Sequence, residues 1–153
     1  DIIHLLLNLL LIHFVGRQTE IILGPQNFTW LCFLGAVSGG LLWLCFNYDS
    51  SGGVPRLIGA SAVCMSCLTY FCLYRPNEEI SMLLFFILPV RLKPKYILWG
   101  ILAIELTFFV NEIKDENQID KFGTSVAHSA HLGGMLMGFL YFYFSSVFLI
   151  NSK

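Results

Sequence analysis

The chain has few charged residues and no dense cluster of either sign. Only 12% of its 153 residues are charged, 56% are hydrophobic, and the mean hydropathy is +0.71. Soluble domains carry about 25% charged residues, so this composition excludes a water-soluble globular protein. Nine Lys and Arg against ten Asp and Glu leave a net charge of -1. With no basic cluster to follow a phosphate backbone, we predict no nucleic-acid partner.

The cysteines lack the spacing of a disulfide framework or a zinc ribbon. Their number is odd, no pair of CxxC motifs is present, and each cysteine lies inside an apolar run. We therefore predict that they act as small apolar packing residues. The five are Cys32, Cys45, Cys64, Cys67 and Cys72.

Long apolar runs dominate what is present. A membrane helix needs about 20 apolar residues, and five runs come close: 2–15, 28–46, 57–74, 96–110 and 122–150. We predict an all-α, polytopic membrane helical bundle with five spans. A sixth run, 80–90, is too short to span and is interrupted by Pro89, so we interpret it as an interfacial or re-entrant segment.

The loop charges predict the orientation, because cytoplasmic loops carry excess Lys and Arg. With five spans, one side has Arg17, Arg75, Arg91, Lys93, Lys95 and Lys153, and the other has Arg56, Lys114 and Lys121. A sixth span would divide them almost evenly. The first side is therefore expected to be cytoplasmic together with the C-terminus, and the loops 47–56 and 111–121 are expected outside. The chain begins at Asp1 without the basic region or cleavage site of a signal peptide, so we expect upstream sequence, with room for another helix, to be missing.

Several polar side chains fall in the outer half of these spans, where polar groups are costly and usually functional. His4 and Asn8 are four residues apart, hence on one helix face. Ser61 is placed near the start of the third span, and His131 about 7 to 9 residues below the outer end of the last, a depth of roughly 10 to 13 Å. A hydroxyl nucleophile needs a base and fixed donors for its oxyanion, and these four residues supply each part.

Four short motifs in this order resemble the rhomboid intramembrane serine proteases. They are His4-Leu-Leu-Leu-Asn8, Glu20-Ile-Ile-Leu-Gly24, Gly59-Ala-Ser61-Ala and Ala130-His131-Leu-Gly-Gly134. The resemblance runs from residue 1 to about residue 143 and covers what would be helices two to six of a six-helix core. It implies one N-terminally truncated rhomboid-like domain over 1–153.

The resemblance implies that Ser61 is the nucleophile and His131 its general base, a dyad without a third acid. His4, Asn8 and the Ser61 backbone N–H would form the oxyanion hole. The substrates would be single-pass transmembrane proteins, cut near the outer end of their helix in the lipid bilayer. No cofactor and no metal ion is predicted.

Small residues are expected to let the third and last spans approach closely. Gly59 and Ala62 on one side and Gly134 on the other are the structural residues nearest the site. The family's usual glycine after the serine is Ala62 here, and the aromatic residue often found four positions after the serine is Met65. We expect both departures to be tolerated.

Other interpretations remain open. A pseudoprotease that binds membrane clients without cutting them is the main alternative, and a small transporter or channel is a third. His128 and His131, three residues apart, could belong to a metal site that His4 or His13 completes, but no Cys or carboxylate is expected at their depth. Glu105 lies well inside the fourth span, and we expect it to be protonated or paired with a group that the sequence does not identify.

Overall fold

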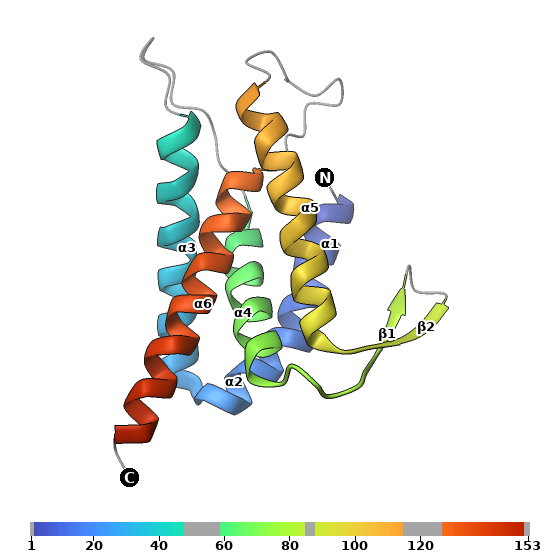
Figure 1. Ribbon diagram of the computed structural model, residues 1–153, viewed down its shortest axis with the longest axis vertical. Helices are drawn as coiled ribbons and strands as arrows, with labels where there is room; N and C mark the ends of the chain where they lie inside the picture. The colour runs from blue at the N-terminus through green and yellow to red at the C-terminus, as the bar shows by residue number, and fades with distance from the viewer. Residues whose placement is uncertain (1, 48–58, 85–87, 115–126, 152–153) are drawn as a thin grey trace.

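The computed structural model describes residues 2–47, 59–84, 88–114 and 127–151, and in this part of the chain each of the five runs predicted to span forms a helix (Figure 1). The first is continuous from Ile2 to Leu23. The elements are α1 (Ile2–Leu11), the π-helical turn η1 (Ile12–Gly16), α2 (Arg17–Leu23), α3 (Pro25–Asn47), α4 (Ser61–Tyr74), α5 (Pro94–Lys114) and α6 (His128–Asn151), with strands β1 (Ile80–Leu84) and β2 (Leu88–Leu92) between α4 and α5.

Two helical segments of the described chain, Ile2–Leu23 and Pro25–Asn47, are long and apolar enough to cross a membrane. The first extends past the predicted end at residue 15, because Thr19 keeps the next turns against the bundle. Its buried hydroxyl lies 2.8 Å from the Val15 carbonyl and 3.3 Å from that of Cys67 in α4. Gly24, with φ of 77°, then ends the helix, and Pro25 starts α3.

Two helices begin later than hydropathy predicted. Gly59 adopts φ of 136°, which no right-handed helix contains, so α4 starts at Ser61 rather than at residue 57. Ala127 is not helical, so α6 starts at His128 rather than at residue 122. Hydropathy records composition and not backbone conformation. His131 is consequently the fourth residue of α6, and its predicted depth in the bilayer stays a prediction.

Helix α4 forms the centre of the bundle. Most of its side chains are buried, and α6, α3, α5 and the first helical segment pack around it (Figure 1). Cys64, Cys67 and Cys72 all belong to this buried set, and the five cysteines of the chain are free thiols. The predicted role as small packing residues is therefore confirmed for these three, whereas Cys32 is half-buried and Cys45 is exposed.

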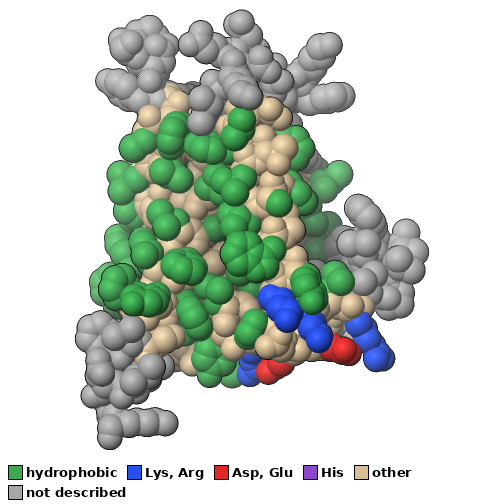
Figure 2. All heavy atoms as spheres, in the orientation of Figure 1, with side chains coloured by type: hydrophobic (Ala, Val, Ile, Leu, Met, Phe, Trp, Pro, Cys, Tyr) green, Lys and Arg blue, Asp and Glu red, His purple; other side chains and the backbone are tan. Residues whose placement is uncertain are grey.

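Hydrophobic side chains cover the helix faces between the two ends of the bundle, as Figure 2 shows on one face. Charged side chains gather at the lower end of this view, where α4 ends and α5 begins. There Arg75 forms an ion pair of 2.9 Å with Glu78, and the Lys95 ammonium donates a 2.8 Å hydrogen bond to the Asn77 side-chain oxygen. An apolar belt above a charged end is the surface expected of a protein held in a bilayer.

The segment 80–90 contains the β1 strand and part of β2. The two strands pair antiparallel, with Ile80 opposite Leu92 and Leu84 opposite Leu88. This hairpin was not foreseen, although the segment was correctly excluded as a spanning helix. Its interfacial position remains a prediction. Most of the two loops predicted to lie outside fall on residues 48–58 and 115–126, beyond the described part of the chain.

Candidate functional site

Ser61 is the first residue of α4, and the start of this helix is uncapped. The preceding Ala60 has no side-chain acceptor, and the first backbone bond into the helix runs from the Cys64 N–H to the Ala60 carbonyl, at 3.0 Å. The N–H groups of Ser61, Ala62 and Val63 therefore have no backbone partner among the described residues. Such a terminus carries partial positive charge and is suited to bind an anion.

Gly59 separates Ser61 from His4. A Cβ atom built on this glycine would lie 3.5 Å from Cε1 of His4 and 3.8 Å from Oγ of Ser61, so the imidazole and the hydroxyl flank one backbone position. Nε2 of His4 is buried and has no hydrogen-bond partner among the described residues. An unpaired buried donor or acceptor is costly, so this nitrogen is available to a group that enters the site.

Asn8 lies one helical turn further along α1, on the same side. Its backbone carbonyl accepts a 3.6 Å contact from the Cys64 thiol, one turn after Ser61 in α4. Its side-chain amide makes no hydrogen bond to any described residue. The structure thus brings α1 against α4 at two levels, with His4 beside Gly59 and Asn8 beside Cys64.

Glycines bring α6 into backbone contact with α4. A Cβ atom on Gly134 would lie 2.8 Å from the Ala62 carbonyl carbon, and one on Gly138 would lie 3.1 Å from Cα of Ser66. Each step is four residues long, so the two helices run parallel and in register. His131 precedes Gly134 by three residues, about 4.5 Å of helix rise, which places it near the level at which α4 begins.

The methyl group of Ala62 fits because α3 has a glycine opposite it. A Cβ atom on Gly39 would overlap the Cβ atom of Ala62 and would lie 2.8 Å from the Ala130 carbonyl. Gly39 has no side chain at this point and so makes room for the methyl group of Ala62. A glycine at position 62 would not need that room. Met65 packs partly buried against the core around Leu68.

Glu105 of α5 joins the two histidines of α6. Its Oε1 lies 3.0 Å from Nδ1 of His131, and its Oε2 lies 2.7 Å from Nδ1 of His128. The exposed fraction is 7% for Glu105 and 6% for His131, which makes them the two buried acidic or basic residues in the described chain. The ring of Phe108, one turn after Glu105, stacks on His128 with a centroid distance of 5.1 Å.

This cluster corrects an expectation about depth. No carboxylate was expected at the level of the two histidines, yet Glu105 is there, and His128 and His131 are the partners of Glu105 that the sequence did not identify. Its ligand atoms and those of His128 and His131 lie within 4.8 Å of one another, a donor set that zinc also accepts. His4 and His13 do not belong to this group.

The described structure contains no hydrogen bond between Ser61 and His131. The side chain of His131 is held through Nδ1 by Glu105, which leaves Nε2 as its free ring nitrogen. Catalytic hydrogen bonds are often long before a substrate binds, so the shared level of the two residues is the relevant geometry. Figure 1 shows both helix starts below the far ends of α3 and α5, hence recessed within the bundle.

Sequence reasoning identified Glu105 as unusual but missed its role. The signal was present, because His128 and His131 share one face of a helix and Glu105 and Phe108 share one face of the preceding helix in the chain. Consecutive helices usually pack side by side. What the sequence lacks is the rotation of each helix about its own axis, which decides whether the two faces meet.

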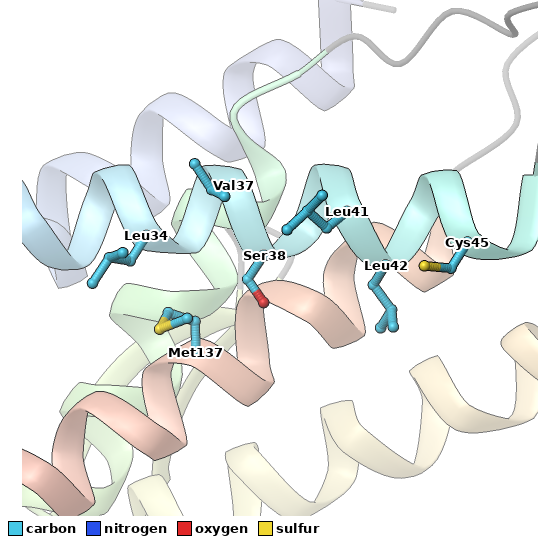
Figure 3. Close-up of a pocket in the computed structure, with 7 residues that line it drawn as sticks. All are labelled: Leu34, Val37, Ser38, Leu41, Leu42, Cys45 and Met137. Atoms are coloured by element: carbon cyan, nitrogen blue, oxygen red, sulfur yellow. The ribbon is translucent and has the colours of Figure 1, made fainter.

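A shallow apolar groove lies elsewhere, between α3 and α6 (Figure 3). It shares no residue with the candidate site, and Ser38, its polar member, donates its hydroxyl to the Gly133 carbonyl at 2.8 Å. The groove is thus part of the apolar outer surface. Its lining residues are Leu34, Val37, Ser38, Leu41, Leu42, Cys45 and Met137.

Comparison with known proteins gives one result. A family model described as the rhomboid domain matches residues 1–148. No curated protein and no solved structure matches the chain.

Proposed function

The chain belongs to the rhomboid family, an assignment that agrees with its helical membrane bundle, and we propose that it is an intramembrane serine endopeptidase. In this proposal Ser61 attacks the scissile carbonyl and Nε2 of His131 takes its proton. The base then returns the proton to the leaving amine, and water releases the acyl group in a second round.

The environment of Gly59 is the observation that carries the proposal. On one side lies the buried and unpaired Nε2 of His4, and on the other the Ser61 hydroxyl at an uncapped helix start. A tetrahedral intermediate needs fixed donors where its negative charge develops. The Ser61 N–H, the His4 imidazole and the Asn8 amide are the three donors that we assign to this role.

The proposed substrates are single-pass transmembrane proteins, cut near the outer end of their helix. Two observations favour this class. The helices that carry Ser61 and His131 begin below the outer ends of α3 and α5, and the bundle presents an apolar surface on which another helix can lie. A segment that unwinds at that depth would present its backbone to Ser61.

A pseudoprotease is the second candidate, favoured by the missing hydrogen bond between Ser61 and His131. In that case the same surface would bind membrane clients without cutting them. The two candidates differ in whether the serine is activated, and this property can be measured without knowing a substrate.

Labelling by a fluorophosphonate probe in detergent tests the proposal. We expect the wild-type protein to be labelled, and Ser61→Ala and His131→Asn to be unlabelled. The Asn side chain can still donate to Glu105 from the position of Nδ1 but has no Nε2, so His131→Asn removes the base and keeps the helix contact. A folded wild-type protein that takes no label would favour the pseudoprotease.

A further inference from the structure

We propose that Glu105 is a positioning residue for His131 and completes a Ser61–His131–Glu105 arrangement within the membrane. This inference rests on the proposed function and extends it, because the resemblance to the family implies a dyad with no acid. Glu105 would touch neither the substrate nor Ser61. It would act by setting the orientation and the tautomer of the base.

The contact uses the ring nitrogen that a positioning acid must use. Oε1 of Glu105 lies 3.0 Å from Nδ1 of His131. A carboxylate at this distance accepts the Nδ1–H, so the other nitrogen, Nε2, is left without a proton and can receive one from a serine. The opposite tautomer would present an N–H to the hydroxyl and could not act as a base.

The charge that develops on His131 during the reaction also favours a positioning role for Glu105. When the base takes the proton of Ser61 it becomes an imidazolium inside the bundle, where an uncompensated charge is costly. The carboxylate of Glu105 would then form a neutral pair with that imidazolium. The compensation matters most after proton transfer, so it lowers the barrier rather than merely strengthening the resting structure.

His128 fixes the carboxylate in place. Its Nδ1 lies 2.7 Å from Oε2, so each oxygen of Glu105 faces one imidazole. The His128 ring stacks on Phe108 and meets the His131 ring edge to face, with centroids 6.0 Å apart. A carboxylate held at both oxygens cannot rotate away from the base. The ring of His128 also packs against the ring of His131. The family often has an aromatic residue four positions after the serine, and this chain has Met65 there.

Steady-state kinetics of Glu105→Gln in the full chain is the first test, with a transmembrane peptide substrate in detergent. The amide keeps the shape of the side chain but cannot accept from both histidines or compensate the imidazolium. We expect kcat to fall about 10- to 1000-fold, which is less than the loss of about 10⁴-fold when a triad aspartate becomes an amide. We expect KM to stay within about 2-fold of the wild-type value.

Thr107→Val is the matched control. This residue is exposed on α5, and its hydroxyl bonds only to the Ala103 carbonyl of its own helix, at 2.7 Å. We expect its kcat and thermal unfolding temperature to equal those of the wild type. A Glu105 that merely tied α5 to α6 would lower the unfolding temperature and raise KM in Glu105→Gln, and this result would overturn the proposal.

A spectroscopic readout separates this inference from the proposed function. In protein labelled with ¹⁵N-histidine, the His131 signals are assigned by their loss in His131→Asn. We expect the Nδ1–H form in the wild type and a shift toward the Nε2–H form in Glu105→Gln. Suppose that Glu105→Gln keeps the wild-type tautomer and full kcat while Ser61→Ala is inactive. This result would overturn the role of Glu105 but not the proposed protease activity. A wild type that neither cleaves nor takes the probe would remove the proposed function and this inference with it.

Chelation distinguishes positioning from metal binding. A zinc ion on Glu105, His128 and His131 would replace both hydrogen bonds and occupy Nδ1 of His131. We expect EDTA to leave the wild-type kcat unchanged. Activity lost on chelation and restored by zinc would overturn the proposal in favour of a metal centre.

Discussion

The side chains of His4 and Asn8 differ in their surroundings. His4 is fixed beside Gly59, and its Nε2 is buried without a partner. Asn8 is half-buried, and only its backbone is engaged, by the Cys64 thiol. A side chain that has no partner in the resting protein can serve a transient charge at little cost to the fold. Loss of either proposed oxyanion donor should therefore affect the rate more than the stability.

Asn8→Ala tests this argument at a single residue. If the amide donates to the oxyanion, its loss should lower kcat by about 10- to 1000-fold, the usual effect of removing one such donor. The unfolding temperature should stay near that of the wild type, because no hydrogen bond to a described residue is broken. Thr29→Val, an exposed substitution on α3 whose hydroxyl bonds only to the Pro25 carbonyl, is the control. An Asn8→Ala protein as active as this control would remove Asn8 from the oxyanion hole.

Sequence reasoning at this scale succeeded where short motifs fix local geometry. The His4/Asn8 spacing indicated one helix face, and in the structure both residues lie against the start of α4. It failed for Glu105, whose contacts depend on how α5 and α6 are rotated toward each other. Spacing within a helix can be read from a sequence, whereas the rotation between two helices is decided by the packing of the whole bundle.

At the scale of helices, the candidate site depends on the close contact between α4 and α6. At Gly134 the two backbones touch, and the same helices carry Ser61 and His131 in their first turns. In a bilayer, helix association relies on close packing because lipid tails are as apolar as the side chains. A change in this spacing would move His131 relative to Ser61.

Gly134→Ala should therefore impair both stability and catalysis. Its Cβ atom would lie 2.8 Å from the Ala62 carbonyl carbon, and backbone cannot move aside as a side chain can. We expect a cost of about 1–3 kcal/mol from overpacking, which exceeds the gain of up to about 1 kcal/mol from replacing glycine in a helix. Thermal unfolding in detergent and probe labelling should both show the loss.

Gly40→Ala is the matched control for that prediction. Gly40 also lies within a helix, but nothing is within 4 Å of a Cβ atom at this position. The substitution should leave labelling unchanged and raise the unfolding temperature slightly. Equal behaviour of the two variants would show that α4 and α6 can separate without harm to the site.

The fold was predictable from sequence at the level of helices and less so at their ends. Runs of apolar residues identified each helix, because burial in lipid demands them. The start of α4 near Ser61 was predicted, whereas α6 begins later than its apolar run, since Ala127 is apolar and yet not helical. The hairpin was also missed, because a short apolar run does not distinguish a strand pair from an interfacial helix.

At the scale of the whole molecule, a charged cluster marks one end of the bundle. Arg75, Glu78 and Lys95 lie together where α4 ends and α5 begins, the end opposite to Ser61. From the positive-inside rule we predict that this end is cytoplasmic and that the candidate site lies toward the outer face. The proposed cleavage near the outer end of a substrate helix requires this orientation.

Accessibility of single cysteines to a membrane-impermeant maleimide tests the orientation. Glu79 and Asn111 are exposed, lie at opposite ends of the bundle, and can each be replaced by cysteine in a Cys45→Ser background, which removes the one exposed native thiol. In intact cells we expect Asn111→Cys to be labelled and Glu79→Cys to be labelled only after the membrane is permeabilised. The reverse pattern would put Ser61 on the cytoplasmic side, and the proposed substrates would then have to be cut at the inner end of their helices.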